Sequence, residues 1–219
     1  MRKCIKVGLD RMRRIKRFLK TPLYFIFNLF SIDLCFQLIK SIVYKQRGNS
    51  IKIGRDTRIR NIKISFCGCN NSIYIGDDCN LNGIRLLLKG NNNKIVIGNS
   101  VFINGTKIQP VTINACEGKT ISIGDDCIFS NNIEIHTTDY HTIFDKNANR
   151  TNHASDIIIG EHCWIGLRVV ILKGSSIPNN TIVGAGAIVS GRHEIPYCLL
   201  TGIPAKSIKQ DVYWDIRLH

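Results

Sequence analysis

The stretch that decides the fold runs from residue 159 to 187 and reads "IGEHCWIGLRVVILKGSSIPNNTIVGAGA". Aliphatic residues recur in it every six positions, at Ile159, Ile165, Ile171, Ile177 and Val183, and the period continues at Val189. Four positions after the first five of these come small or branched residues: Cys163, Val169, Ser175, Thr181 and Ala187. An α-helix has 3.6 residues per turn and cannot keep a period of six on one face. The stretch is therefore not helical.

The same unit occurs earlier in the chain. "IGDDC" stands at 75–79 and at 123–127, and related units are "IGRDT" at 53–57 and "IGNSV" at 97–101. No helical stretch separates these short segments, which excludes a βαβ arrangement. A triangular coil of short strands fits the pattern: the aliphatic residue points inward, the glycine and the polar pair turn the corner, and the small residue fills the space inside it. Stacked turns then bury a continuous column.

Isoleucine-glycine repeats of this kind, followed by "TGIPAK" at 201–206, resemble the hexapeptide-repeat acyltransferases, whose fold is a left-handed parallel β-helix. The segment "TTDYHTIFD…RTNHASDIIIGEHCWIG" is most similar to bacterial O-acetyltransferases of capsule, lipopolysaccharide and sialic-acid polymers. The resemblance covers about residues 51–209, and before residue 120 the repeat units lie 22 residues apart. We therefore predict an all-β chain with the following parts: a basic amphipathic helical extension (1–50), a left-handed β-helix (51–206) with a loop at 137–156, and a short C-terminal tail (207–219).

The positive charge lies mostly in the N-terminal segment. Residues 1–47 hold twelve Lys and Arg against two Asp and Glu (12 − 2 = +10), out of a formal net charge of +14 for all 219 residues. The body of the chain therefore carries only a small excess, and the high net charge is no argument for nucleic-acid binding.

The apolar part of this segment, 23–44, is interrupted by Asn28, Asp33, Gln37 and Lys40, which disfavours a membrane-spanning helix. We expect no signal peptide, because no small-residue cleavage site follows the apolar stretch. Two interpretations stay open: a helix packed on the body or on a partner subunit, and a peripheral anchor on an anionic membrane. Both place the protein in the cytoplasm, the second at the inner face of the membrane.

The chain contains nine cysteines, and three of them share one context. Cys79, Cys127 and Cys163 all end an isoleucine-glycine unit. At that position we expect them to act as small, weakly hydrophobic interior residues, without a disulfide or a metal.

The repeat fails after Ile135 and returns at Ile159. Between these residues the segment 137–156 is polar, as expected of a loop extruded from a rigid coil, where chemistry is often placed. His136 and His141 stand at its start, five positions apart. A zinc site would need a third ligand, and no histidine precedes His136, so we predict no metal. From the residues alone, a general base and a loop without a role both stay open.

The resemblance assigns the base to His141. Related O-acetyltransferases carry Ser/Thr-Asp-x-His at this loop, which Thr138 to His141 match. An imidazole with a pKa near neutrality suits removal of a sugar hydroxyl proton. His136 follows Ile135 in strand alternation, so we expect it to point outward as a solvated strand residue. Asp139 is predicted to bind substrate, to orient His141 or simply to cap a turn.

The resemblance also implies acetyl-CoA as co-substrate and a homotrimer with its sites between subunits. Trp164 would lie near the thioester and the acceptor, and the backbone of Leu167 and Ala185 would contact the pantetheine arm. Ser190, Lys206 and Lys209 match positions that hold the nucleotide end in relatives.

Two positions depart from the family pattern. The link "SGRHEIP" at 190–196 is about two residues longer than usual, so Arg192 is an alternative to Ser190. His153 stands where many relatives have proline.

The predicted function is acetyl-CoA-dependent O-acetylation of a surface-glycan sugar. No Ser, Cys or Lys nucleophile is placed beside a base, which favours direct transfer. Two alternatives stay open: N-acetylation of an amino-sugar nucleotide, and a non-catalytic β-helix serving as a scaffold subunit.

Overall fold

The computed structural model describes residues 47–216, and their regular structure consists of 20 strands in three sheets. The first sheet contains β1 (Ser50–Ile53), β4 (Ser72–Ile75), β7 (Lys94–Ile97), β10 (Thr120–Ile123), β13 (Ile157–Ile159) and β16 (Ser176–Ile177). The second contains β2 (Arg58–Arg60), β5 (Asn80–Asn82), β8 (Phe102–Asn104), β11 (Ile128–Phe129), β14 (Trp164–Ile165), β17 (Ile182–Val183), β19 (Cys198–Gly202) and β20 (Ala205–Gln210). The third contains β3 (Lys63–Cys67), β6 (Ile84–Lys89), β9 (Val111–Cys116), β12 (Ile133–His136), β15 (Val170–Ile171) and β18 (Ile188–Val189).

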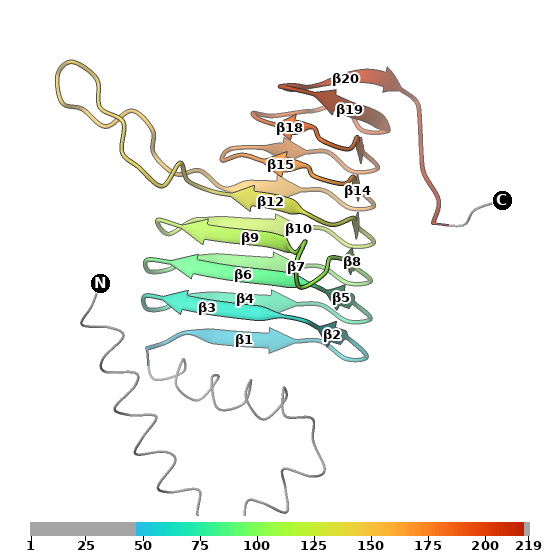
Figure 1. Ribbon diagram of the computed structural model, residues 1–219, viewed down its shortest axis with the longest axis horizontal. Coiled ribbons are helices and arrows are strands. Elements are labelled where there is room, and N and C mark those ends of the chain that lie inside the picture. Colours follow the sequence, from blue (N-terminus) through green and yellow to red (C-terminus); the bar gives the residue numbers. More distant parts are fainter. Residues whose placement is uncertain (1–46, 217–219) are drawn as a thin grey trace, which may run out of the picture. The chain divides into compact units, whose positions relative to one another are not determined.

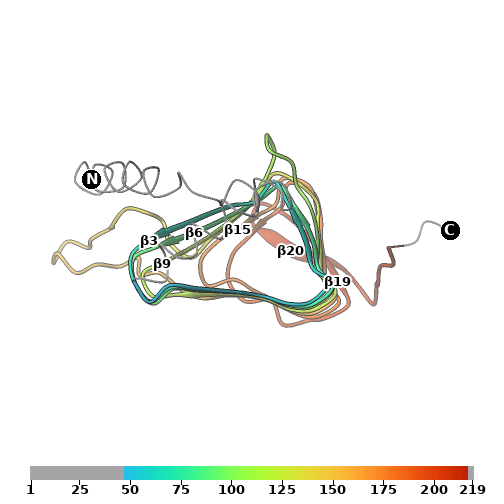
Figure 2. The ribbon, with the colours of Figure 1, turned by 90° about the horizontal axis from the view of Figure 1, so that it is seen from below.

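From β1 to β18, consecutive strands lie in different sheets, and every third strand returns to the same wall, parallel to the strand below it. Six turns stack in this way into a triangular prism, seen from the side in Figure 1 and along its axis in Figure 2. The predicted parallel β-helix is thus confirmed as a parallel β-solenoid. Its last strand, β20, pairs antiparallel with β19 and ends at Gln210, four residues beyond the predicted end of the domain. The predicted helical extension lies outside the described residues, apart from 47–50.

The core is a set of aliphatic ladders, one on each wall, as the six-residue period predicts. On the first wall Ile75, Ile97, Ile123, Ile159 and Ile177 follow one another in register and are at most 1% exposed. On the second wall the ladder contains Leu81, Ile103, Phe129, Ile165, Val183 and Leu200. Each turn therefore completes the apolar surface of the turn below it.

The repeat glycine allows the turns to approach each other. A Cβ at Gly76 would lie 2.6 Å from the carbonyl oxygen of Gly98 in the next turn, closer than two such atoms can come. The left-handed backbone of the corner falls instead on the second polar residue, with φ of 57° at Asp78 and 56° at Asp126. The glycine was expected to help the chain change direction at the corner. Instead it makes room for the neighbouring turn of the solenoid, and the second polar residue adopts the left-handed backbone that changes the chain direction.

The first polar residue of the repeat pairs the corners of neighbouring turns. The side-chain Oδ1 of Asn99 accepts the backbone N–H of Asp77 at 2.9 Å, and Oδ1 of Asp125 accepts that of Asn99 at 2.8 Å. Backbone N–H groups that the strands leave free at the corner are satisfied in this way. This explains the Asp or Asn at positions 77, 99, 125 and 179. Arg55 and Glu161 stand at the same position of the repeat and donate their backbone N–H groups to Asp77 and Asn179.

The recurrent cysteines lie inside the prism, as predicted. Cys79, Cys127 and Cys163 are at most 1% exposed, and the thiols of Cys79 and Cys127 donate to the carbonyl oxygens of Gly98 and Gly160, both at 3.1 Å. Burial raises the pKa of the Cys79 thiol, so it stays protonated and able to donate. The cysteines fill the corner and hold the next turn.

The third wall explains why early repeats are 22 residues apart and late ones 18. Its strands have five or six residues in the first three turns and two in the last two. The early turns therefore extend further at the corner between the third and first walls, where the late turns step inward, as Figure 2 shows.

An asparagine ladder fills that wider corner. Asn71, which is fully buried, donates from Nδ2 to the carbonyl oxygen of Gly90 at 2.9 Å, and its Oδ1 accepts the backbone N–H of Asn93 at 2.9 Å. Asn49 and Asn93 make equivalent contacts below and above. The six-residue period does not predict this ladder, because its asparagines lie outside the repeat unit.

Replacement of Asn71 by Ala is expected to lower the free energy of unfolding by about 3 kcal/mol, because it leaves the buried N–H of Asn93 and the half-buried carbonyl of Gly90 unpaired. Urea denaturation followed by circular dichroism measures the loss. The control is Asn147→Ala in the exposed loop, with an expected change of less than about 0.5 kcal/mol. Equal stability of the two variants would contradict this role for the ladder.

Candidate functional site

The loop at 137–156 joins β12 of the third wall to β13 of the first, and its base is anchored inside the prism. The buried hydroxyl of Thr137 accepts the backbone N–H of Cys116 at 2.8 Å and donates to the carbonyl oxygen of the same residue at 3.3 Å. Where the chain returns, the N–H of Ser155 donates to the carbonyl of Thr137 at 3.0 Å. Both ends of the loop are thus tied to one point of the rigid coil.

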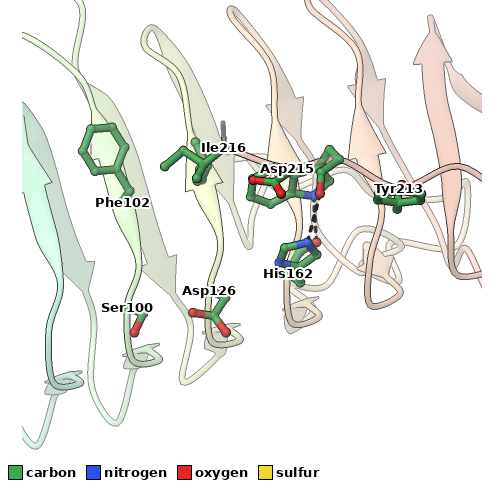
Figure 3. Close-up of a pocket in the computed structure, with 9 residues that line it drawn as sticks. Ser100, Phe102, Asp126, His162, Tyr213, Asp215 and Ile216 are labelled. Atoms are coloured by element: carbon green, nitrogen blue, oxygen red, sulfur yellow. Dashed lines mark hydrogen bonds between the residues drawn. The ribbon is translucent and has the colours of Figure 1, made fainter. Parts of the chain in front are cut away.

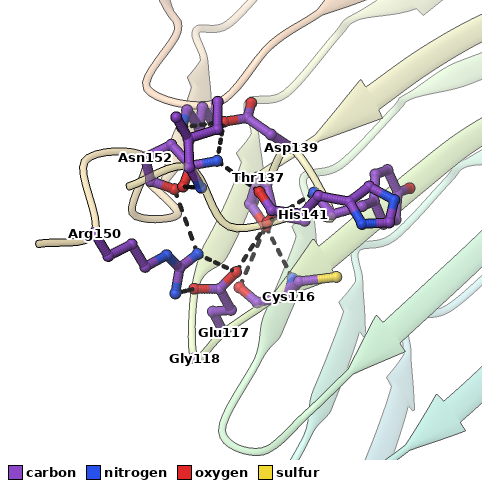
Figure 4. A network of polar contacts seen from close by, with 12 residues as sticks. Cys116, Glu117, Gly118, Thr137, Asp139, His141, Arg150 and Asn152 are labelled. Carbon is purple, nitrogen blue, oxygen red and sulfur yellow. Dashed lines mark hydrogen bonds and ion pairs between the residues drawn. The ribbon is translucent and has the colours of Figure 1, made fainter. Parts of the chain in front are cut away.

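An ion pair holds the loop to the turn below. Nη1 and Nη2 of Arg150 lie 2.8 and 2.9 Å from the two carboxylate oxygens of Glu117 (Figure 4). The same carboxylate accepts the hydroxyl of Thr138 at 2.9 Å. The hydrogen bond from Arg150 lowers the pKa of the Glu117 carboxyl, so the pair stays charged at neutral pH.

Asp139 connects the loop to the turn above. Its carboxylate pairs with the ammonium group of Lys173 and accepts Nδ2 of Asn152 at 2.9 Å. The hydrogen bond from Lys173 lowers the pKa of the Asp139 carboxyl. Of the roles left open for Asp139, the geometry favours a local one that holds the loop, because the carboxylate is engaged by these two side chains.

The side chain of Asn152 connects three residues of the loop by hydrogen bonds. Its Oδ1 accepts the N–H of Ile143 at 2.7 Å, and its Nδ2 donates to the carbonyl oxygen of His141 at 2.7 Å as well as to Asp139. The N–H of His141 donates to the carbonyl of Asp139 at 2.8 Å. The backbone of His141 is therefore fixed on both sides. Within residues 47–216 its exposed side chain has no hydrogen-bond partner, which leaves both ring nitrogens available to a ligand.

His136 differs from the solvated residue that the sequence predicts. It does point outward from β12, as strand alternation requires, but its side chain is 19% exposed. Its Nδ1 lies 2.9 Å from the hydroxyl of Tyr140, and its Nε2 lies 3.0 Å from Oε2 of Glu134. Burial lowers the pKa of the imidazole, partly opposed by the charge of Glu134. The sequence does hold a signal for this contact, since residues 134 and 136 share one face of a strand.

Trp164 opens β14 on the second wall, where the C-terminal residues fold back over it. Trp214 stacks on His162 with ring centroids 4.3 Å apart and donates from Nε1 to the carbonyl of His162 at 3.0 Å. Its ring centroid also lies 6.3 Å from that of Trp164, which stays 44% exposed. The predicted C-terminal tail, 207–219, includes Trp214, whose contact with His162 no sequence motif indicated.

The returning tail and the outer face of the second wall together line an open pocket of about 490 Å³ (Figure 3). Apolar and aromatic side chains supply most of its lining: Phe102, Ile128, His162, Tyr213, Trp214 and Ile216. Ser100 and Asp126 add oxygen atoms at the corner.

Most of the residues predicted to hold acetyl-CoA lie apart from His141. Leu167 and Ala185 are exposed at the corner between the second and third walls, and Lys206 and Lys209 are exposed on β20. Ser190 and its alternative, Arg192, are exposed just after β18. His141 and Asp139 lie at the corner between the third and first walls. One chain therefore brings His141 and Asp139 together and places Ser190 and Arg192 at the same corner, in a later turn. Trp164, Leu167, Ala185, Lys206 and Lys209 lie on the second wall or at its end, away from that corner.

Residues 47–216 contain neither a metal-binding cluster nor a membrane-spanning helix. This part of the chain contains no group of three or more His, Cys, Asp and Glu side chains arranged to hold a metal ion. It also contains no helix long and apolar enough to cross a bilayer.

The parallel β-solenoid of six-residue units agrees with the resemblance to hexapeptide-repeat acyltransferases. A solved polysialic acid O-acetyltransferase, OatWY, is 32% identical to this chain with a TM-score of 0.61, over 78% of this chain and 90% of the other. The solved polysialic acid-specific acetyltransferase NeuO is 28% identical with a TM-score of 0.62, over 78% and 86%. The chain belongs to the hexapeptide-repeat acetyltransferases.

Curated sequences agree over a shorter region. The polysialic acid O-acetyltransferase of Neisseria meningitidis is 35% identical over 108 residues, which are 49% of this chain and 50% of the relative. The chain thus spans about half the length of that relative. No protein-family model matches the sequence.

Removal of the Asn152 side chain is expected to free the loop without unfolding the solenoid. In Asn152→Ala, amide hydrogen exchange at Ile143 should accelerate by about tenfold or more, because its acceptor is lost and two further contacts go with it. Exchange followed by mass spectrometry measures this, with Asn147→Ala as the matched loop control. Unchanged exchange in Asn152→Ala would show that the loop is held by other contacts.

Proposed function

We propose that this chain transfers the acetyl group of acetyl-CoA directly to a hydroxyl of a surface-glycan sugar, with His141 as general base. The observation that carries the proposal is the state of His141: its backbone is fixed on both sides while its imidazole is exposed and unpartnered within residues 47–216. Fixed backbone and free ring are what a positioned base requires. The likeness to polysialic acid O-acetyltransferases favours a glycan acceptor.

The reaction requires one proton to move twice. As the acceptor oxygen attacks the thioester carbonyl, a new C–O bond forms and the neutral imidazole of His141 takes the hydroxyl proton. Collapse of the tetrahedral intermediate breaks the C–S bond, and the imidazolium returns the proton to the departing thiolate. A backbone N–H or a bound water would stabilise the oxyanion between these steps.

A complete site would need a second copy of the chain. Trp164 and the acetyl-CoA candidates Leu167, Ala185, Lys206 and Lys209 lie at other corners than His141, so they would meet the His141 of a neighbouring subunit. We therefore propose a homotrimer with sites between subunits. Asp139 would shape the acceptor side of that site through the loop that it holds.

Replacement of His141 by Ala is expected to lower kcat by about 10²–10⁴ while the melting temperature stays near that of the wild type. Thiol release from acetyl-CoA measures turnover against a panel of polysialic acid, sialic acid, hexoses and amino sugars. The matched control is His153→Ala, which removes another exposed histidine of the same loop and should retain activity. Full activity of His141→Ala would contradict its role, and turnover of amino sugars alone would favour N-acetylation.

The N-terminal segment is proposed to bring the enzyme to the inner face of the membrane. Its net charge of +10 (12 − 2 over residues 1–47) should attract anionic headgroups, each Lys or Arg near the surface contributing about 1 kcal/mol. Co-sedimentation of the full chain with phosphatidylserine vesicles should exceed that of a chain lacking 1–46, and the difference should fall as salt rises. Equal sedimentation of both chains would contradict membrane anchoring.

A further inference from the structure

Five polar side chains form one continuous chain of hydrogen bonds beside His141. They come from β9, β12 and the loop, in the order Cys116, Asn114, Tyr140, His136 and Glu134. The Sγ of Cys116 lies 3.3 Å from Oδ1 of Asn114, and Nδ2 of Asn114 contacts the hydroxyl of Tyr140. Cys116 and Asn114 are 3% and 4% exposed, so the start of the chain is shielded from water.

The carboxylate at one end fixes the direction of every bond. Ionised Glu134 only accepts, so His136 donates from Nε2 and its Nδ1 is left as an acceptor. The hydroxyl of Tyr140 must then donate to Nδ1, and its oxygen accepts the amide N–H of Asn114. The carbonyl oxygen of Asn114 accepts the thiol of Cys116. Donors and acceptors match throughout when His136 is neutral, and burial favours that state by lowering its pKa.

The chain of hydrogen bonds holds an unusual backbone. Tyr140 has φ of +65°, a left-handed conformation that a large side chain rarely adopts. It is also the residue directly before His141, so its conformation decides where the imidazole points. The hydroxyl of Tyr140, hydrogen-bonded to Asn114 and His136, opposes relaxation of this turn from the side-chain end. The backbone bond between Asp139 and His141 and the contact from Asn152 hold the main chain of the same turn.

We propose that Glu134 and His136 are positioning residues that act through the hydroxyl of Tyr140 to aim the imidazole of His141. This inference rests on the proposed function, because it assigns His141 the role of base. It replaces the sequence-based expectation that His136 is a solvated residue of no consequence. His136 has no contact with the reacting atoms in this scheme. It accepts the hydroxyl of Tyr140, and this hydrogen bond stabilises the left-handed turn before His141.

The test compares Tyr140→Phe, which removes only the hydroxyl, with Tyr74→Phe on the exposed first wall. Tyr140→Phe should lower kcat by about 10- to 100-fold and leave KM for acetyl-CoA and acceptor within about twofold, because misaligned groups slow the chemical step rather than binding. Tyr74→Phe should leave both constants unchanged. His136→Asn keeps an acceptor near the position of Nδ1, so it should retain more kcat than His136→Leu, which keeps none.

Wild-type kcat in Tyr140→Phe and in His136→Leu, with His141→Ala inactive, would overturn the positioning role and leave the proposed function intact. A measurement without substrate decides the geometry independently. Nitrogen-15 spectra of the folded chain should show His136 neutral, with its proton on Nε2, and the carbon-13 shifts of residue 140 should report a left-handed backbone that relaxes in Tyr140→Phe. A proton on Nδ1 of neutral His136, or unchanged shifts in the variant, would contradict the proposal even if the wild type acetylated no acceptor.

Discussion

Close stacking of one turn on the next is the constraint on which the whole structure depends. Each turn hydrogen-bonds to its neighbour along all three walls, and at one corner this approach requires the repeat glycine, as at Gly76 beneath Gly98. The aliphatic ladders, the thiol contacts and the asparagine ladder all depend on this short distance between neighbouring turns. At that distance the aliphatic side chains exclude water, and the thiols and asparagines satisfy buried polar groups of the next turn.

Because the stacked turns are rigid, they can fix the loop at 137–156 through side chains from several turns. The clamp around His141 draws on three turns, with Glu117 from the third, Asp139 from the fourth and Lys173 from the fifth. These residues are far apart in sequence, and only the fixed rise between turns brings them within hydrogen-bonding distance of one loop. The step from 22-residue to 18-residue turns falls at the same corner, so the loop leaves the prism where its outline changes.

Much of the fold could be predicted from the sequence, because the six-residue period states directly which side chains face inward. Ile159, Ile165 and Ile171 fall on three successive walls, and Cys163 fills a corner, as that period requires. The site could be predicted only in part. His141 was identified through its resemblance to a family, while the contacts of Tyr140 with His136 and of Trp214 with His162 were missed. Those two contacts join residues with no shared repeat position, so no sequence period predicts them.

The coil, the position of the loop and the concentration of positive charge in residues 1–47 follow from the sequence alone, because each is a local pattern or a residue count. The tertiary structure decided which polar side chains meet: Asn152 with His141, Tyr140 with His136, and Trp214 with His162. The physical reason is that hydrogen bonds of this kind depend on distance and angle between segments brought together by stacking. The repeat fixes how the turns stack, but the irregular segments, namely the loop at 137–156 and the C-terminal tail, supply the polar side chains that meet at the site.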